Sequence, residues 1–307
     1  MRLIVLGSAA GGGFPQWNSN ADGCRRARTG DPAALSRTQT SLAISADGRA
    51  WFVLNAAPDL RAQIQATPAL WPNSGLRSSP IAGVVLTGGD VDAVAGLLHL
   101  RERHRFDLYA TRSVLGVLET NRIFDVLARD CVERRALPLD TPIALTPPDG
   151  GPALQVRAFA VPGKVPLYLE GADFKAGSFV EDDTTIGLEL WQDDASHAFF
   201  IPGCATMTKA LAARLEGAAL VLFDGTLWTD DEMIRLGLGA KSGRRMGHIS
   251  VADPDGAIAS FRALGVARKV FVHINNSNPM LIEGSAERRA AADAGWEVAH
   301  DGMELAL

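Results

Sequence analysis

The sequence predicts an α/β protein in which two mixed β-sheets pack face to face with helices outside. Short apolar runs typical of buried strands recur along the chain, and helix-like segments follow several of them. Each half also combines antiparallel strand candidates with strand–helix units. The 307 residues exceed the usual size of one hydrophobic core, but sandwiches of this length fold as single units, so we expect one domain spanning residues 1–307.

The first part of the chain predicts a strand, a long loop, a hairpin and a helix. Residues 2–6 are aliphatic and β-branched, as in a buried strand. Residues 7–38 are Gly-rich and lack periodicity, which predicts a long functional loop. Residues 40–45 and 51–55 flank Asp47-Gly48, the strongest local signal for a β-hairpin. A helix-like spacing follows at 58–66.

The middle of the chain predicts alternating strands and helices. Residues 81–87 form a strand candidate, and residues 92–103 a helix that Asp92 is placed to cap. Residues 106–110 are again apolar, and residues 113–127 have the spacing of an amphipathic helix.

The second half predicts a similar mixture of elements. Its strand candidates are residues 154–160, 185–191, 198–201, 220–223, 269–273 and 296–299, followed by a terminal strand. Its helix candidates are residues 208–215, 254–264 and 285–294. Residues 147–152, which begin and end with Pro, predict a turn at the boundary between the two halves.

Composition and charge exclude several classes of protein. The hydrophobic fraction is 47%, the charged fraction is 21% and the net charge is −5, as in ordinary soluble globular proteins. Only Arg25, Arg26 and Arg28 form a basic cluster, so we expect no nucleic-acid partner. No apolar stretch approaches the 18 or so residues of a membrane span, so we expect no membrane insertion and a cytoplasmic protein. The cysteines, Cys24, Cys131 and Cys204, are too few for a disulfide framework.

Several polar residues follow the predicted strands at the point where each strand ends. Asp90 and Asp92 come after residues 81–87, Cys204 after 198–201, and Asp224 after 220–223, while His273 ends residues 269–273. Strand ends offer side chains to a shared cleft. A divalent metal site usually takes three or four ligands from Asp, Glu, His and Cys, so these residues are candidate ligands.

Each of these residues also has a purely structural interpretation. Asp92 can be a helix N-cap, and Cys204 a small buried hydrophobic residue. Asp224 can fix a turn through hydrogen bonds from its side chain to the backbone. His273 can be a hydrogen-bonded core histidine. The sequence leaves these alternatives open.

Six unusual strings occur in a specific order along the whole chain. They are residues 6–18 (LGSAAGGGFPQWN), 55–61 (NAAPDLR), 161–166 (VPGKVP), 201–205 (IPGCA), 245–249 (RMGHI) and 271–279 (FVHINNSNP). With them the chain closely resembles the coenzyme PQQ synthesis protein B family, which belongs to the metallo-β-lactamase fold superfamily. The resemblance implies an αββα sandwich with its cleft at the strand ends, in agreement with the two-sheet prediction.

The resemblance also implies a role in making pyrroloquinoline quinone (PQQ) from a Glu-Tyr-containing precursor. One implied activity is hydroxylation of the tyrosine ring by non-haem iron, because iron with open positions can bind O₂. The alternative is a non-catalytic protein that binds PQQ or its precursor and carries it towards the periplasm. The expected partners are this precursor and other PQQ-biosynthesis proteins, and a homodimer is one alternative for the assembly.

The metal motif departs from the pattern of the superfamily. Its His-x-His-x-Asp-His positions correspond to Gly88, Asp90, Asp92 and Ala93, its bridging Asp to Cys204, and its last histidine to His273. Ala93 cannot bind a metal, so the predicted ligands are Asp90, Asp92 and His273. Two carboxylates and one imidazole favour Mg²⁺ or Mn²⁺ relative to a site with His at residue 93, and Fe(II) stays a candidate. A two-metal hydrolase would need histidines that are missing here.

A second departure concerns the N-terminal loop. The family commonly has Cys-x-Cys-x-x-Cys after Trp-Asn, whereas this chain has Ser19, Ala21 and Cys24. One thiolate cannot make a structural zinc site, so we expect no zinc there.

Further charged residues fall within the matching strings or beside the predicted strand ends. Lys164, Asp224 and Arg245 are predicted to bind an anionic, carboxylate-rich ligand, and His248 is predicted to act as an acid–base or substrate-contacting catalytic residue.

Overall fold

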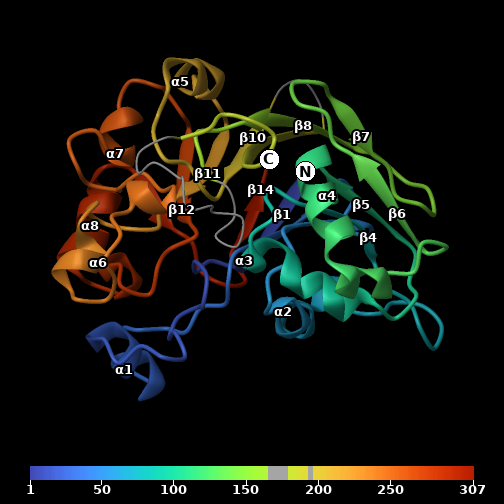
Figure 1. The fold of residues 1–307 in the computed structure, drawn as a ribbon, viewed down its shortest axis with the longest axis horizontal. Coiled ribbons are helices and arrows are strands. Elements are labelled where there is room, and N and C mark those ends of the chain that lie inside the picture. The colour runs from blue at the N-terminus through green and yellow to red at the C-terminus, as the bar shows by residue number, and fades with distance from the viewer. Residues whose placement is uncertain (165–178, 193–195) are drawn as a thin grey trace.

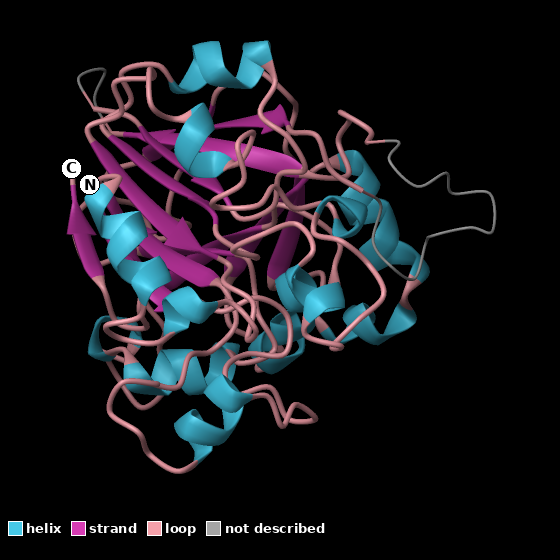
Figure 2. Ribbon diagram, turned by 90° about the vertical axis from the view of Figure 1, so that its left-hand side faces the viewer, coloured by secondary structure: helices cyan, strands magenta, loops and turns pink. Residues whose placement is uncertain are grey.

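Two β-sheets form the middle of the molecule, and helices cover their outer faces (Figure 1, Figure 2). The structure is a computed structural model that describes residues 1–164, 179–192 and 196–307. Within these residues each sheet has seven strands. The predicted α/β arrangement of two mixed sheets with helices outside is therefore confirmed.

The first sheet has the strand order β14-β1-β2-β3-β4-β5-β6. Strands β14 to β3 pair antiparallel, and β3 to β6 pair parallel. The strands are β1 (Arg2–Gly7), β2 (Ser41–Ser45), β3 (Trp51–Leu54), β4 (Ile81–Val85), β5 (Phe106–Ala110), β6 (Val132–Ala136) and β14 (Glu304–Ala306).

The second sheet has the order β13-β12-β11-β10-β9-β8-β7, in which β10 to β13 are parallel and β7 to β10 antiparallel. Its strands are β7 (Ile143–Leu145), β8 (Leu154–Ala160), β9 (Ile186–Trp191), β10 (Ala198–Ile201), β11 (Leu220–Asp224), β12 (Arg268–Val272) and β13 (Trp296–Val298).

Three apolar clusters hold these layers together. The central cluster lies between the sheets and takes residues from both, including Leu42, Val85, Leu188, Phe200 and Leu222. Burying one such side chain contributes about 1.5–3 kcal/mol. Because both halves of the chain share this cluster, neither sheet buries its inner face without the other, and the single domain over residues 1–307 stays a prediction.

The outer face of each sheet packs against helices. On the first sheet these are α2 (Leu60–Ala66), α3 (Val91–Val94) and α4 (Arg112–Thr120), which with their flanking turns supply part of one apolar cluster. On the second sheet they are α5 (Lys209–Leu215), α7 (Ala257–Ser260) and α8 (Ala286–Asp293). Two further helices, α1 (Asp22–Arg28) and α6 (Glu232–Arg235), lie near one end of the sandwich (Figure 1).

The two sheets are tied together at the end where the parallel strands finish. An isolated bridge joins Ala9 after β1 to Ile274 after β12, and a second joins Gly88 after β4 to Thr185 before β9. The carboxyl ends of β4, β11 and β12 therefore face one shared region, as expected for ligand sites in such sheets. At the opposite end the termini meet, and the Met1 amino group donates to the Leu307 carbonyl at 2.8 Å (Figure 1).

Most predicted strands are confirmed, and three have the predicted bounds: β5, β8 and β10. The hairpin around Asp47-Gly48 is confirmed by the antiparallel pairing of β2 and β3. Residues 147–152 do form a turn, but it lies within the β7–β8 hairpin, so the chain passes between the sheets earlier, between β6 and β7.

Other predictions need correction. Residues 7–38 are not all loop, because they contain α1. The helix predicted at 92–103 is a short α3 followed by a 3₁₀ helix (Ala95–Leu100), since the Ala93 carbonyl accepts from the backbone of Ala56 at 2.7 Å instead of continuing the helix. Gly96 permits this close approach, because a Cβ there would lie 2.1 Å from the Ala57 carbonyl oxygen. The helix predicted at 113–127 likewise divides into α4 and a 3₁₀ helix (Arg122–Val126).

Among the described residues, none of the helices combines the length and the apolar character needed to cross a membrane.

Candidate functional site

A cleft of about 540 Å³ opens where the parallel strands of both sheets end. Its walls contain seven residues that the sequence analysis singled out or that replace a ligand: Gly88, Asp90, Asp92, Ala93, Lys164, His248 and His273. The fold therefore brings Asp92 and His273 together across 181 positions of sequence. Arg245, in a 3₁₀ helix (Arg244–Met246), is not among the residues that line the cleft, and its predicted contact with a ligand stays a prediction.

Asp90 and Asp92 come from the junction that follows β4. Helix α3 begins at Val91, so Asp90 occupies the N-cap position and Asp92 lies in the first turn. The interpretation of Asp92 as the helix cap is therefore wrong. Its Oδ2 atom instead lies 2.9 Å from Nε2 of His273. Burial disfavours the charged carboxylate, but the hydrogen bond and the charge of His273 outweigh burial and lower the pKa of Asp92.

His273 follows the last residue of β12 and has a backbone φ of 55°. This left-handed conformation is uncommon for a residue with a Cβ and costs about 1–3 kcal/mol. In this backbone conformation the imidazole ring of His273 points towards Asp92. Burial disfavours the imidazolium form of His273, but the Asp92 hydrogen bond and the nearby carboxylates outweigh burial and raise its pKa. In a buried histidine without a charged partner, burial would instead lower the pKa.

Asp224 ends β11 and lies fully buried beneath the cleft. Its Oδ2 accepts hydrogen bonds from the Cys204 backbone at 3.0 Å and from His248 Nδ1 at 2.7 Å. Its Oδ1 accepts from the backbone and the hydroxyl of Thr226 at 3.0 and 2.6 Å. A carboxylate has about four acceptor positions, and all four are used here. Asp224 thus holds a turn and orients His248, and its predicted contact with a ligand stays a prediction.

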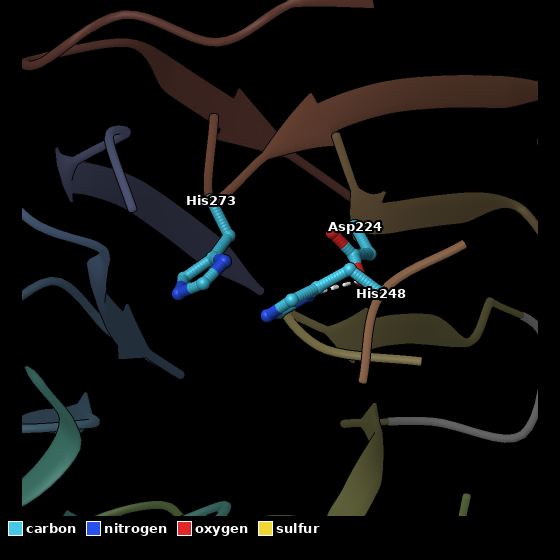
Figure 3. Close-up of side chains that lie close together, drawn as sticks. All are labelled: Asp224, His248 and His273. Atoms are coloured by element: carbon cyan, nitrogen blue, oxygen red, sulfur yellow. Dashed lines mark hydrogen bonds and ion pairs between the residues drawn. The ribbon is translucent and has the colours of Figure 1, made fainter. Parts of the chain in front are cut away.

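His248 is placed by the 3₁₀ helix that precedes it. Gly247 ends this helix with φ 91°, a left-handed conformation that favours glycine. A Cβ at Gly247 would also come within 3.0 Å of the Lys164 side chain. The His248 ring stacks on the His273 ring with centroids 5.1 Å apart, and both residues line the cleft (Figure 3). Because Nδ1 of His248 is bound to Asp224, its Nε2 is the nitrogen left for the cleft.

The residues present fit a divalent metal ion. One atom each from Asp224, His248 and His273 lies within 4.8 Å of the others. We exclude Asp224 as a ligand because its acceptor positions are filled. Asp92 is the carboxylate beside His273, and its 2.9 Å separation from Nε2 of His273 matches the roughly 3 Å expected between two ligands bound at about 2.0–2.1 Å to one ion.

The second imidazole changes the metal preference expected from the sequence. Asp90, Asp92 and His273 alone favour Mg²⁺ or Mn²⁺, whereas adding His248 gives two imidazoles with carboxylates, a set that suits Fe(II) and Zn²⁺. Ala93 also lines the cleft and is nearly buried, but it offers no donor atom.

Two lysines contribute positive charge to the cleft wall. Lys164 was predicted from the sequence, and Lys241 was not. Lys241 lies in the loop after α6, where no strand end or matching string marks it. The residues that follow Lys164 in the VPGKVP string, Val165 and Pro166, lie outside the described residues.

The part of the N-terminal loop around Cys24 does not line the cleft. Cys24 in α1 is buried, and its Sγ lies 3.5 Å from Oδ1 of Asn276. Arg28 donates to the Ser19 carbonyl at 2.5 Å and to the Gln16 carbonyl. These bonds hold the loop locally, and the absence of structural zinc there stays a prediction. Cys204 is also fully buried, and burial strongly raises the pKa of its thiol, in keeping with its interpretation as a small buried residue.

Comparison with known proteins gives a consistent result. Residues 50–274 match the beta-lactamase superfamily domain. The chain is 62% identical over 304 residues to coenzyme PQQ synthesis protein B of Gluconacetobacter diazotrophicus, covering 99% of this chain and 98% of the relative. It is 53% identical over 310 residues to the protein of the same name from Xanthomonas euvesicatoria, with both chains fully covered.

Solved structures agree with these relatives. A structure of Zn²⁺-bound PqqB from Methylobacterium extorquens superposes with a TM-score of 0.94 at 50% identity, and each chain is covered completely. A diphosphatase of the PhnP family gives a TM-score of 0.67 at 19% identity, over 99% of this chain and 97% of that one, which shows the fold alone. The predicted metallo-β-lactamase-like sandwich is therefore confirmed.

Proposed function

The chain belongs to the coenzyme PQQ synthesis protein B family and has the metallo-β-lactamase fold, and from this we propose a metal-dependent oxidation within PQQ biosynthesis. The family name implicates PQQ biosynthesis, and the fold with a Zn²⁺-bound neighbour implies metal binding. The substrate that we propose is a Glu-Tyr-derived precursor, and the reaction is hydroxylation of its tyrosine ring. We further propose cytoplasmic action on precursor supplied by other proteins of the pathway.

One observation carries this proposal. Asp92 and His273, from different sheets, lie 2.9 Å apart in a cleft that His248 also lines. Two imidazoles and a carboxylate match the donor set that leaves open positions on non-haem Fe(II). Asp90, on the same junction as Asp92, is the fourth donor in the proposal.

The chain's own residues bind and orient the substrate. Lys164 and Lys241 line the cleft and suit the carboxylates of a Glu-Tyr precursor. Gly11 and Gly12 also line the cleft. The sheets exclude water from the strand side of the site, because Leu222 and Phe223, which precede Asp224 in β11, belong to the apolar clusters.

The proposed reaction balances with an external reductant. When bound, Fe(II) supplies the activation of O₂. One oxygen atom of O₂ enters a ring C–H bond and leaves a hydroxyl group there. The other oxygen leaves as water, and a two-electron reductant supplies two electrons, which enter with two protons.

Anaerobic loading with Fe(II), followed by O₂, a two-electron reductant such as ascorbate and a Glu-Tyr peptide, tests this function. We expect stoichiometric iron uptake and a product 16 Da heavier than the substrate, as one added oxygen atom requires. His99→Ala serves as a control, because His99 is exposed and does not line the cleft. Iron uptake without any hydroxylated product contradicts the oxidation.

A carrier function is the second candidate, and Ala93 is the observation that favours it. A nearly buried alanine replaces a ligand position of the superfamily motif at the cleft wall. If the chain binds PQQ or its precursor tightly but takes up no iron, the cleft serves binding and transport. Equilibrium binding of PQQ to metal-free protein, measured beside the iron titration, separates the two functions.

A further inference from the structure

The hydroxyl of Thr226 lies at the centre of the site, although no pattern in the sequence marks it. Its Oγ1 is 2.6 Å from Asp224 Oδ1, 3.0 Å from His273 Nδ1 and 3.1 Å from His248 Nδ1. It is also 2.9 Å from the backbone carbonyl oxygen of His273. Thr226 is 4% exposed, so water does not compete for these contacts.

The proton on this hydroxyl can be assigned by counting donors and acceptors. A hydroxyl donates one hydrogen bond and accepts two. Its shortest contact is to Asp224, whose carboxylate already accepts two backbone N–H groups, so the hydroxyl donates there. Without a proton between them, two oxygen atoms 2.6 Å apart would repel.

The two imidazoles must then donate to the remaining lone pairs. His273 Nδ1 reaches Thr226 Oγ1, and His248 Nδ1 is shared between Asp224 and Thr226. A neutral imidazole with a proton on Nδ1 has its lone pair on Nε2. In His273 a metal ion would take the place of the Nε2 proton that reaches Asp92 at 2.9 Å. Both Nε2 atoms are the ones directed towards the cleft (Figure 3).

We propose that Thr226 is a positioning residue that fixes both His248 and His273 as the Nδ1–H tautomer, so that each presents Nε2 to a metal ion. This inference rests on the metal site proposed above and adds the group that holds its two nitrogen donors. The hydroxyl is not required for the turn itself, because the Thr226 backbone N–H already closes that turn on Asp224 at 3.0 Å.

Two substitutions at this position test the inference without turnover. Thr226→Val keeps the shape but removes the hydroxyl, whereas Thr226→Ser keeps the hydroxyl. Removing a hydrogen-bond partner of a ligating histidine typically weakens metal binding 10–100-fold. We therefore expect Thr226→Val to lose about 10–100-fold in Zn²⁺ affinity, and Thr226→Ser to change it by less than about threefold. A chelator competition gives both values.

Nitrogen NMR of the Zn²⁺-loaded wild-type protein gives an independent readout, which does not depend on any variant folding. We expect Zn²⁺ on Nε2 and a proton on Nδ1 of both His248 and His273. Zn²⁺ bound through Nδ1 of either ring overturns the proposal, as does unchanged affinity in Thr226→Val. A wild-type protein that binds no Zn²⁺ refutes the metal site itself and the inference with it, whereas a lack of hydroxylase activity bears on neither.

Discussion

The two walls of the cleft are built very differently. The wall from the second sheet is a closed network in which Asp224 accepts four hydrogen bonds and the rings of His248 and His273 stack. The wall from the first sheet is the short junction after β4, where Asp92 reaches across to His273 and Ala93 offers no donor. One wall is preorganised, and the other supplies carboxylates from a single turn of helix.

This difference predicts which wall contributes more to the metal affinity of the site. A buried network with all acceptors satisfied keeps its geometry at no further entropy cost when a ligand binds. The histidine missing at Ala93 belongs to the less connected wall, so its loss leaves the network intact. The second wall should therefore dominate binding, and the first should tune it.

Removing His273 should have the largest effect, because it ends the contact between the walls. We expect His273→Ala to weaken Fe(II) or Zn²⁺ binding more than about 100-fold, beyond the usual loss for an outer partner. Chelator competition measures the affinity, with His99→Ala as the matched control on an exposed histidine. Equal affinity in the two variants would place the metal elsewhere.

The substitution Asp224→Asn should have the second largest effect on metal affinity. An amide group can accept hydrogen bonds on only one side, so two of the four donors around residue 224 lose their acceptor. We expect the free energy of unfolding to fall by about 1–3 kcal/mol and metal affinity to fall about 10–100-fold. Urea unfolding and metal competition measure the two effects. If only stability falls, Asp224 has no part in orienting His248.

Ala93→His tests the weaker wall by adding the missing donor. Ala93 lines a cleft of about 540 Å³, which has room for an imidazole. We expect metal affinity to rise about tenfold, or 1.4 kcal/mol. Ala95→His, at a position outside the cleft lining, is the control. A gain in both variants would indicate nonspecific binding by added histidine.

The smallest predicted effect is the pH dependence of the metal-free protein. The pKa of Asp92 lies below its ordinary 3.8, so its contribution to stability is lost as pH falls through the lowered value. The pKa of His273 lies above its ordinary 6.5, so its contribution is complete below 6.5 and is lost as pH rises through the raised value.

The pair should therefore stabilise the metal-free protein most between pH 3.8 and 6.5, by about 1 kcal/mol. Urea unfolding across pH measures this, and Asp92→Asn should flatten the part of the profile that belongs to the pair. An identical profile in Asp92→Asn would show that the pair does not link the walls in solution.

Buried apolar segments made much of the fold predictable. Strands β5 and β10 have the predicted bounds because each is a run of buried residues, and β8 has them because its buried residues recur in alternation with half-buried ones. Strand β6 was missed because it contains Glu133, Arg134 and Arg135, which suit an exposed edge but hide the strand pattern. Helix α1 was missed because seven mostly polar residues show no helical period.

The site was predictable only in part, for a similar reason. Asp90, Asp92 and His273 end or follow apolar strands, and strand ends are visible in the sequence. His248 lies in a loop and was found through the resemblance alone, and it was assigned an acid–base role. The position of Thr226 depends on how β11, β12 and the 247–249 loop meet in space, which no local pattern encodes.

Anomalous diffraction from crystals loaded with Fe(II) or Zn²⁺ tests the central claim most directly. We predict one metal ion bound by Asp92, His248 Nε2 and His273 Nε2, with Asp224 behind His248 and outside the coordination sphere. A metal ion bound by Asp224, or one located away from His273, would contradict it.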